Sequence, residues 1–321
     1  MSLYPPWTSV SEAAALLVSG HIVAIPTETV YGLAGNALDP LALAKIFAAK
    51  GRPVFDPLIV HIASIDSLKD VAQNIPPAAY ALAEAFWPGP LTLVLPKQPC
   101  IPDLATSGLF TVAVRIPEHP LAQEIILKAE VPLAAPSANL FKHVSPTTAE
   151  HVATQLGDKI DGIVNGGPCK VGVESTIVSF ENGEAVILRP GAITPAMIES
   201  VIGKVTLKRS TSNPGEAMLS PGSMETHYQP RIPLYYGTLP EKFILPQNTV
   251  RLAFGQTTSR LPATLNLSKT ANLIEATAHL YAYIHELDTP PHEFILVDPI
   301  PNEGLGIALN DRLQRASVKK I

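Results

Sequence analysis

Four basic residues stand where predicted helices or strands end, and their placement indicates an anionic ligand. Lys50 and Arg52 follow a helical segment, while Arg115 and Arg189 close two segments that are predicted to be strands. The helix dipole by itself explains a lysine in the last turn, but Arg52 lies beyond the glycine at which that helix should end. A guanidinium group suits phosphate or carboxylate. In a chain with only 16% charged residues, four such placements predict one anion-binding pocket.

Small polar side chains also interrupt the apolar strands in three other places. Residues 26–33, 135–139 and 173–178 each put hydroxyl or carboxylate groups next to a strand, where open α/β sheets form pockets. A capped turn explains the first of these segments equally well, and both interpretations stay open. A lone histidine in an apolar strand, such as His61, is more typical of a core than of a ligand site. Ser145 is predicted to cap a helix, and helix N-termini also bind phosphate.

The common signatures of nucleotide, metal and serine-hydrolase sites are missing from the sequence. It has no P-loop, no Gly-x-Gly-x-x-Gly, no His-Glu-x-x-His, no paired Cys-x-x-Cys and no Gly-x-Ser-x-Gly. The two cysteines, Cys100 and Cys169, lack metal-ligand spacing and are expected to be ordinary reduced thiols. These observations predict a nucleotide or polyphosphate pocket that works without a covalent nucleophile.

The composition limits the classes of protein to which this chain can belong. Hydrophobic residues make up 46% of its 321 residues, which excludes a wholly disordered chain, and the length predicts two domains. The net charge of -5 disfavours sequence-independent binding to long nucleic acid but is compatible with a local basic pocket. No apolar run approaches the ~20 residues that span a bilayer, and the N-terminus does not resemble a signal peptide. We therefore expect a cytoplasmic protein.

Caps, breakers and hydrophobic spacing place the elements that must position these side chains. Ser9 and Glu12 form a capping box that opens a helix ended by Gly20. Asp39 opens a second helix that ends at Gly51, and further helices are expected at 145–157 and 194–203. Strands are expected at 21–25, 58–62, 91–95, 111–115, 175–180 and 185–188, the last two joined by a hairpin turn. Such mixing of strands and helices predicts an α/β fold.

Breakers divide the chain into three parts. Residues 204–233 contain Ser-Thr-Ser-Asn-Pro-Gly, Ser-Pro-Gly and Gln-Pro, a density that predicts a linker without packed structure. Beyond it, strands at 234–236, 250–254 and 294–297 and helices at 268–287 and 310–319 predict a second, smaller α/β domain. The expected organisation is a large domain at 1–203, a linker at 204–233 and a small domain at 234–321.

Seven segments, in order, resemble the signatures of the YrdC-like family. They are residues 26–33, 50–62, 87–92, 111–117, 135–139, 172–177 and 188–191. The rest of the chain is similar to the family's long, two-domain threonylcarbamoyl-AMP synthases, through Ser220-Pro221-Gly222, His227-Tyr228 and Asn310-Asp311-Arg312. Each motif by itself is weakly specific, whereas their number and order are specific. The match covers nearly the whole chain.

The resemblance implies a twisted, open mixed sheet with flanking helices in the first, catalytic domain and a Rossmann-like second domain. It implies an enzyme that makes threonylcarbamoyl-adenylate and pyrophosphate from L-threonine, bicarbonate and ATP, for threonylcarbamoyladenosine modification of tRNA. It places L-threonine against Thr29, His61, Arg115, Ala135 and Ser175, with Arg115 on the carboxylate. It places ATP against Lys50, Arg52, Asp56, Thr111, Ser137, Ser145, Arg189 and Tyr228. Lys50 and Arg52 would be catalytic, and Mg²⁺ would arrive with ATP, without a metal site on the protein.

Two departures from the family pattern concern the ATP site. Asp56 stands where many members have asparagine, and residues 223–226 replace a stretch that is often basic. We therefore do not expect this stretch to clamp the phosphates. Residues 204–233 would form a lid that excludes water while the carbamate reacts, with contacts from His227 and Tyr228; a solvated tether is the alternative.

Two other classes of function remain open. An RNA-binding module would suit the concave, positive pocket of the family, but the net charge and the lack of an aromatic-interleaved basic stretch oppose it. A carbamoyl-adenylating enzyme is the second alternative, although relatives of that kind carry a zinc finger for which this chain lacks the cysteines. The expected partners are small-molecule substrates and the downstream machinery that transfers threonylcarbamoyl to tRNA, with weak contact to tRNA at most and none to a membrane.

Overall fold

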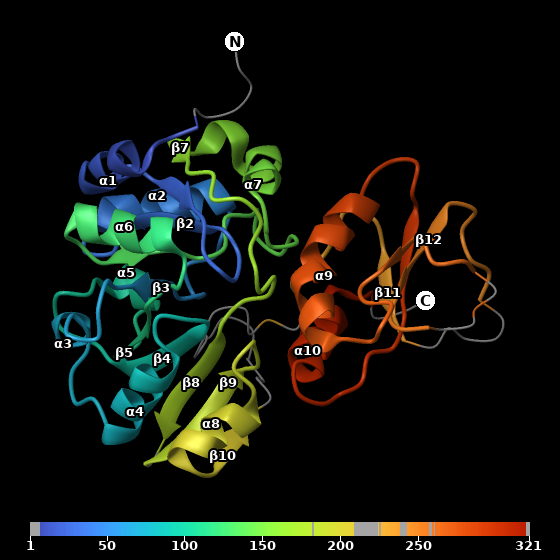
Figure 1. Cartoon of the computed structure of the whole chain (residues 1–321). Coiled ribbons are helices and arrows are strands. Elements are labelled where there is room, and N and C mark those ends of the chain that lie inside the picture. The colour runs from blue at the N-terminus through green and yellow to red at the C-terminus, as the bar shows by residue number, and fades with distance from the viewer. Residues whose placement is uncertain are drawn as a thin grey trace.

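The chain folds into two domains, each built around one β-sheet (Figure 1). This computed structural model describes residues 7–181, 183–208, 224, 226–237, 243–256, 259 and 261–318. Within these residues the large sheet has ten strands, in the spatial order β10 (Val205–Leu207), β9 (Glu184–Arg189), β8 (Thr176–Glu181), β4 (Leu91–Pro96), β5 (Thr111–Arg115), β3 (Ile59–His61), β6 (Leu133–Ala134), β2 (Gly32–Asn36), β1 (Val23–Ile25) and β7 (Gly162–Ile163). The small sheet has four parallel strands there, in the order β11 (Leu234–Tyr236), β14 (Phe294–Val297), β12 (Thr249–Ala253) and β13 (Leu265–Asn266). The predicted α/β class is confirmed for both domains.

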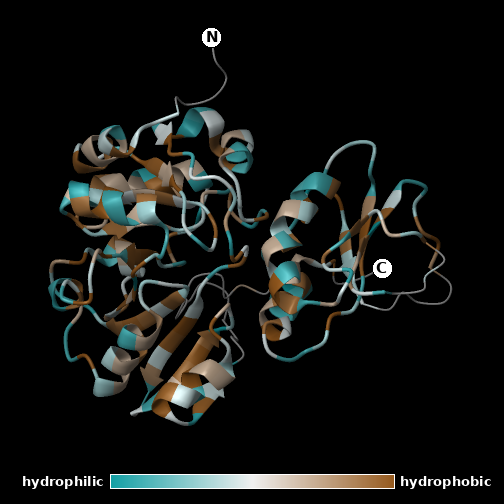
Figure 2. Ribbon diagram, in the orientation of Figure 1, coloured by the Kyte–Doolittle hydropathy of each residue, from teal (hydrophilic) through white to brown (hydrophobic). Residues whose placement is uncertain are grey.

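Helices cover both faces of the large sheet because its strands bury side chains on both sides. Along β1, Val23 and Ile25 join one apolar cluster and Ala24 joins another, as the alternation of a strand requires. The cluster of Val23 is covered by α1 (Val10–Val18) and α6 (Pro120–Ala129). The cluster of Ala24 is covered by α2 (Pro40–Lys50), α3 (Leu68–Val71), α4 (Pro77–Phe86), α5 (Asp103–Thr106), α7 (Ala149–Leu156) and α8 (Pro195–Ile202). Figure 2 shows brown, hydrophobic residues along the strands of this sheet.

Helix starts that depend on local caps agree with the sequence. Ser9 accepts a hydrogen bond from the backbone N–H of Glu12, whose carboxylate accepts one from Ser9, and this capping box opens α1. Asp39 caps α2, which ends at Gly51 with a left-handed φ of 61°. Thr194 caps α8. These predictions are confirmed because a cap and its partner lie within one turn of each other.

The helix predicted at 145–157 is shorter than expected, and its predicted cap is wrong. α7 follows Thr148, whose side chain accepts a hydrogen bond from the N–H of His151. Ser145 lies three residues earlier and donates its hydroxyl to Glu174, 2.5 Å away and distant in sequence. Serine and threonine are both good cap residues, so the local pattern could not choose between them. The contact with Glu174 decides the role of Ser145.

The predicted linker contains regular structure at its start. Residues 205–207 form β10, which pairs in parallel with β9 and extends the large sheet beyond residue 203. The expectation of a segment without packed structure is therefore wrong here, because Val-Thr-Leu favours a strand and the breakers begin only at Ser210. Residues 209–223 and 225, Asn182 of the predicted hairpin turn and residues 319–321 lie outside the described residues.

The second domain turns its two helices toward the first, as Figure 1 shows. They are α9 (Leu273–Leu287) and α10 (Gly306–Ala316). Both differ in their starts from the predicted bounds, since Asn272 caps α9 and α10 begins four residues before Asn310. Side chains of both helices share one buried apolar cluster with Val30, Val144 and Val173 of the first domain. The domains therefore contact through a common apolar core.

Candidate active site

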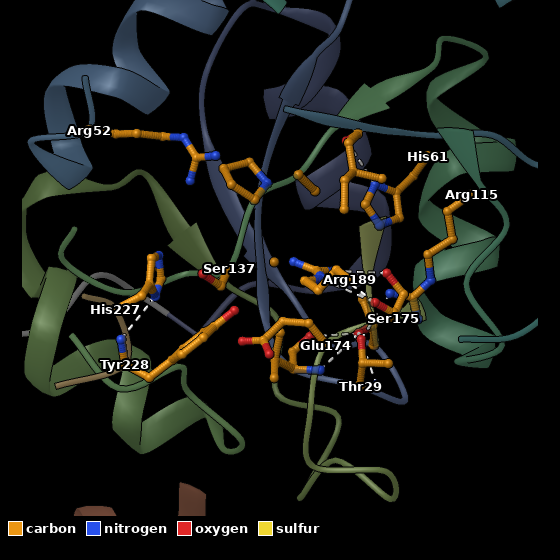
Figure 3. A pocket seen from close by; sticks show the side chains of 16 residues that line it. Thr29, Arg52, His61, Arg115, Ser137, Glu174, Ser175, Arg189, His227 and Tyr228 are labelled. Carbon is orange, nitrogen blue, oxygen red and sulfur yellow. Dashed lines mark hydrogen bonds between the residues drawn. The ribbon is translucent and has the colours of Figure 1, made fainter. Parts of the chain in front are cut away.

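A polar pocket lies where the carboxyl ends of central strands of the large sheet approach the segment that leads into the second domain (Figure 3). About 50 Å³ of its interior is open to the centre of a water molecule. It is lined by Thr27, Thr29, Val30, Gly32, Arg52, Ile59, His61, Arg115, Ala135, Pro136, Ser137, Glu174, Ser175, Arg189, His227 and Tyr228. Three arginines thus line one small pocket.

One end of the pocket is organised by Arg115. β3 and β5 run in parallel in a register that sets Arg115 beside His61, at the end of each strand. The guanidinium donates from Nη1 to the Thr29 hydroxyl at 2.9 Å and from Nη2 to the Glu28 carboxylate at 2.5 Å. Its Nε donates to the carbonyl of Gly89. This buried arginine is therefore held in place from three sides, and it still faces the pocket.

His61 is a neutral member of this end of the pocket. Burial, helped by the nearby positive charge of Arg115, lowers the pKa of His61 to about 3. Its Nδ1 lies 3.2 Å from the carbonyl oxygen of Ile59. At neutral pH the ring can therefore exchange hydrogen bonds with a ligand without adding a charge.

Ser175 and Arg189 form the floor of the pocket between β8 and β9. Arg189 donates from Nε and Nη2 to the Ser175 carbonyl, and from Nη2 to the Ser175 hydroxyl at 3.1 Å. The same hydroxyl lies 2.7 Å from that of Thr92. The antiparallel pairing of β8 with β9 shifts register between Ile177 and Val178, next to this contact. The strand start predicted to carry hydroxyl groups therefore presents Ser175 to the pocket.

Lys50 and Arg52 lie on the opposite side, and contacts within the first domain engage both cations. Lys50 donates from Nζ to the carbonyls of Ser137 and Asn139, at 2.5 and 2.6 Å, and does not line the pocket. Burial and the neighbouring Arg52 hold the pKa of Lys50 well below its usual value. Arg52 donates to the carbonyls of Asp56 and Pro57 and pairs with the Asp56 carboxylate at 2.8 Å. Asp56 thus offsets the charge of Arg52.

Glu174 is a pocket residue for which the sequence predicts no role. Its carboxylate accepts hydrogen bonds from Ser145 at 2.5 Å, Tyr281 at 3.0 Å and Arg312 at 2.8 Å. Burial by itself would raise the pKa of Glu174, but Arg312, Arg189 and the bond from Ser145 lower it to about 2. The group is therefore a carboxylate at any physiological pH.

Tyr228 closes the pocket from the segment that precedes the second domain. The backbone of Tyr228 has a left-handed φ of 64°. The residues on either side of it are fixed by backbone hydrogen bonds: the His227 N–H donates to the Arg315 carbonyl, and the Gln229 N–H donates to the Lys142 carbonyl. The buried Tyr228 hydroxyl has no hydrogen-bond partner among the described residues. Burial raises the pKa of Tyr228 to about 12, so it stays a donor. A hydroxyl without a partner on the wall of a pocket is available to a ligand.

The structure gathers most of the predicted site residues around one cavity. Those that line it are Thr29, Arg52, His61, Arg115, Ala135, Ser137, Ser175, Arg189 and Tyr228. Three further predicted residues do not line the cavity, but each contacts a residue that does. Lys50 contacts Ser137, Asp56 contacts Arg52, and Ser145 contacts Glu174. Thr111 stands at the start of β5, four residues before Arg115, and does not line the cavity. In the part of the chain that the structure describes, no three His, Cys, Asp or Glu side chains converge as metal ligands.

Known proteins resemble this chain over nearly its full length. The family described as "Telomere recombination", which groups Sua5, YciO and YrdC, matches residues 15–191, and "Threonylcarbamoyl-AMP synthase, C-terminal domain" matches residues 193–318. The threonylcarbamoyl-AMP synthase of Bacillus subtilis is 42% identical over 96% of this chain and 92% of its own length, and that of Pyrococcus abyssi is 39% identical over 96% and 94%. The crystal structure of P. abyssi Sua5 complexed with L-threonine superposes with a TM-score of 0.87 at 37% identity, covering 96% of this chain and 94% of that one.

Proposed function

Since this chain belongs to the two-domain Sua5/YrdC family of threonylcarbamoyl-AMP synthases, we propose that the pocket described above is where it makes threonylcarbamoyl-adenylate. The observation that carries the proposal is the lining of one buried cavity. Arg115 and Thr29 suit the carboxylate and hydroxyl of an amino acid, and Arg52 and Ser137 suit phosphate groups of a nucleotide. The two substrates would thus meet within a single cavity.

The reaction asks for positioning rather than for a nucleophilic side chain. The amine of threonine attacks the carbon of bicarbonate, a C–N bond forms, and water leaves as the carbamate appears. A carbamate oxygen then attacks the α-phosphorus of ATP, and the bond to the β-phosphate breaks to release pyrophosphate. Holding two bound substrates in line lowers the barrier of steps of this kind, and fixed positive groups stabilise the charge that develops. The absence of a nucleophile motif from the sequence is consistent with this chemistry.

L-threonine would bind at the end of the pocket that Arg115 organises. The part of the Arg115 guanidinium that faces the pocket would bind the threonine carboxylate, with Glu28 and Gly89 fixing the orientation of the arginine. Thr29 and neutral His61 contact the remaining polar groups of the amino acid. Ala135 and Ser175 complete the wall at this end. The carbamate then forms toward the centre of the pocket.

ATP would bind between Arg52 and Ser137 on one side of the pocket and Arg189 on its floor. Lys50 and Arg52 act on the phosphates after exchanging their present carbonyl partners, in line with the predicted catalytic role of these two cations. Asp56, Ser145 and Tyr228 belong to the same side, and Thr111 contacts the nucleotide beyond the present wall. ATP enters as its Mg²⁺ complex, in which the phosphates hold the ion. Because Asp56 is paired with Arg52 in this chain, this contact tunes the phosphate site.

The segment before the second domain would act as a lid over ATP. Its described end supports this role, because His227 and Tyr228 are buried and line the cavity. Residues 209–223 and 225 of the predicted lid lie outside the described residues. The three-part organisation belongs to this proposal, with the first domain extended to residue 208 by β10 and the second domain beginning after residue 233. The lid would exclude water while the labile carbamate reacts.

The product would pass to the machinery that transfers threonylcarbamoyl to tRNA, and direct contact with tRNA would be weak. We propose that the protein works in the cytoplasm. Within the described residues no helix is long and apolar enough to cross a bilayer.

Pyrophosphate release with each substrate left out in turn tests the proposal. We expect release to require ATP, L-threonine and bicarbonate together, and the adenylate to be recovered as the product. Turnover that ignores threonine would favour a carbamoyl-adenylating enzyme instead. Salt-sensitive binding of RNA without turnover would favour an RNA-binding module.

A further inference from the structure

Glu174 connects the pocket of the first domain to the second domain. Its carboxylate accepts a hydrogen bond from Ser145 of the first domain and from Tyr281 of α9, and it pairs with Arg312 of α10. In Figure 3 Glu174 lies on the pocket wall between Tyr228 and Arg189. One carboxylate thus holds groups from three distant parts of the chain.

All three guanidinium nitrogens of Arg312 donate hydrogen bonds in this cluster. Arg312 is 1% exposed, the largest side chain buried to that degree among the described residues. Its Nε donates to Glu174, its Nη2 to the carbonyl of Pro190, and its Nη1 to Asp311. Its guanidinium carbon also lies 5.3 Å from the centre of the Tyr228 ring. Arg312 therefore reaches from the second domain into the wall of the pocket.

The charges around the pocket explain what this contact achieves. Arg52 pairs with Asp56 and Arg115 with Glu28, so these arginines find their carboxylates within the first domain. Glu174 is the pocket-lining carboxylate, and its ion-pair partner Arg312 comes from the second domain, while Arg189 of the first domain is a second nearby positive charge. A buried carboxylate without its cation would repel a triphosphate at short range, where little water screens the charge.

We propose that Arg312, with Tyr281, is a positioning residue for ATP: the second domain supplies the counter-charge that stops Glu174 from repelling the triphosphate and keeps Ser145 at the nucleotide side of the pocket. The inference rests on the proposed function, in that it takes ATP to be the ligand. It assigns the second domain a part in building the site, in addition to covering it.

Two opposite substitutions separate this role from a merely structural contact. Arg312→Met keeps the length of the side chain but removes the ion-pair partner of Glu174, with Arg189 left as the neighbouring cation, and we expect ATP affinity to fall at least about tenfold. Glu174→Gln removes the repelling charge, so ATP affinity should stay within about threefold of the wild type. The double variant should recover most of the affinity lost in Arg312→Met. A contact that only joins the domains would make both single variants weak and the double variant no better.

A smaller change and a matched control complete the series. Tyr281→Phe removes one hydrogen bond to Glu174 while keeping the ring, so ATP affinity should fall about threefold even if Arg312→Met does not fold. Arg251→Met breaks the buried pair with Asp298 inside the second domain, away from the pocket. It should lower thermal stability without changing ATP affinity. Weakening of ATP by Arg251→Met to the same degree as by Arg312→Met would overturn the proposal.

Calorimetric titration of the full chain with ATP and, separately, with L-threonine provides the readout. Threonine affinity should change less than about twofold in every variant, because Arg115 and Glu28 are untouched. Equal loss of both affinities in Arg312→Met would contradict a role directed at ATP. Titration does not depend on turnover. A wild-type chain that binds ATP but makes no adenylate would therefore refute the proposed reaction and leave this test readable.

Discussion

Two buried arginine–carboxylate pairs each contribute one residue to the lining of the same pocket, and they are built differently. Arg115 and Glu28 both belong to the first domain, and Arg115 lies at the end of a central strand whose parallel neighbour carries His61. Arg312 and Glu174 are 138 positions apart in sequence and come from different domains. The proposed threonine end of the pocket is therefore complete within one domain, whereas the proposed nucleotide side depends on the docking of the other.

This difference predicts which substitutions should lower threonine binding and which should lower ATP binding and turnover. Removing one partner of a buried pair leaves an uncompensated charge, which costs about 3–5 kcal/mol of stability. For Arg115 and Glu28 that cost falls on the proposed threonine site. For Arg312 and Glu174 it falls on the contact between the domains. Changes to the second domain should therefore affect ATP and turnover before they affect threonine.

Removing the second domain should produce the largest effect on turnover. A chain that ends after Lys208 retains β10 and the Arg115–Glu28 pair but loses Tyr228 and Arg312. We expect adenylate formation to fall by about two orders of magnitude, the scale on which the loss of one fixed electrostatic group lowers a rate. Threonine should still bind. Circular dichroism checks the fold, and adenylate formation equal to that of the full chain would show that the second domain acts elsewhere.

Arg115→Ala tests the pair that lies within the first domain. Losing a charge-assisted contact costs about 1.5–3 kcal/mol, so threonine should bind roughly ten to a hundred times more weakly. ATP affinity should change far less, because Arg115 pairs with Glu28 and Thr29 at the opposite end of the pocket. Calorimetric titration of both ligands measures the ratio. Lys128→Ala, which removes an exposed ion pair with Glu124 within α6, is the control. Equal weakening of both ligands would refute the assignment of Arg115.

Acid should destabilise the interdomain side more than the threonine side. Burial lowers the pKa of His61, His227 and His285 to about 3 each, so the folded chain holds them neutral. In the unfolded chain the three histidines become protonated below about pH 6.5. The free energy of unfolding is therefore highest above that pH and falls as the pH drops toward 3. Each histidine should contribute about 1.4 kcal/mol per pH unit within this window.

Urea unfolding between pH 7 and pH 5 measures this loss of stability. His61 belongs to the threonine end, whereas His227 lies next to Tyr228 and His285 contacts the Ser145 carbonyl from α9. His61→Gln should therefore remove part of the pH dependence, and His227→Gln with His285→Gln about twice as much. Burial also lowers the pKa of His119 and His151, so these two should account for a smaller remainder. A pH dependence that all three substitutions leave unchanged would show that other groups take up the protons.

The cysteines should give the smallest effect and serve as a control for both sides. Cys100 is exposed, while burial and the nearby Glu28 raise the pKa of Cys169 to about 12, so Cys169 stays a thiol. Cys100→Ser and Cys169→Ser should each retain activity within about twofold. A loss of turnover with the circular dichroism spectrum unchanged would mean that a thiolate takes part in the reaction.

Features that depend on neighbours in sequence could be predicted. The capping box of Ser9, the glycine end at Gly51 and the strand at 111–115 are all confirmed, because a few adjacent residues determine each of them. The residue types and their spacing also indicate an anion pocket by themselves, since arginines at strand ends have few other uses in a chain so poor in charge. The seven ordered segments are sufficient to recognise the family.

The tertiary structure alone decided how these residues combine. Ser145 fits a helix cap by pattern but donates to Glu174, and Lys50 fits a phosphate ligand but binds two carbonyls. Arg312 gives no signal of a role at the pocket beyond its family motif, because its partner lies far away in the chain and in another domain. Sequence patterns report contacts within a turn or a strand, whereas the charge balance of a buried pocket is set by whichever side chains folding brings together. The residue types were therefore determined by the sequence, and their partners by the tertiary structure.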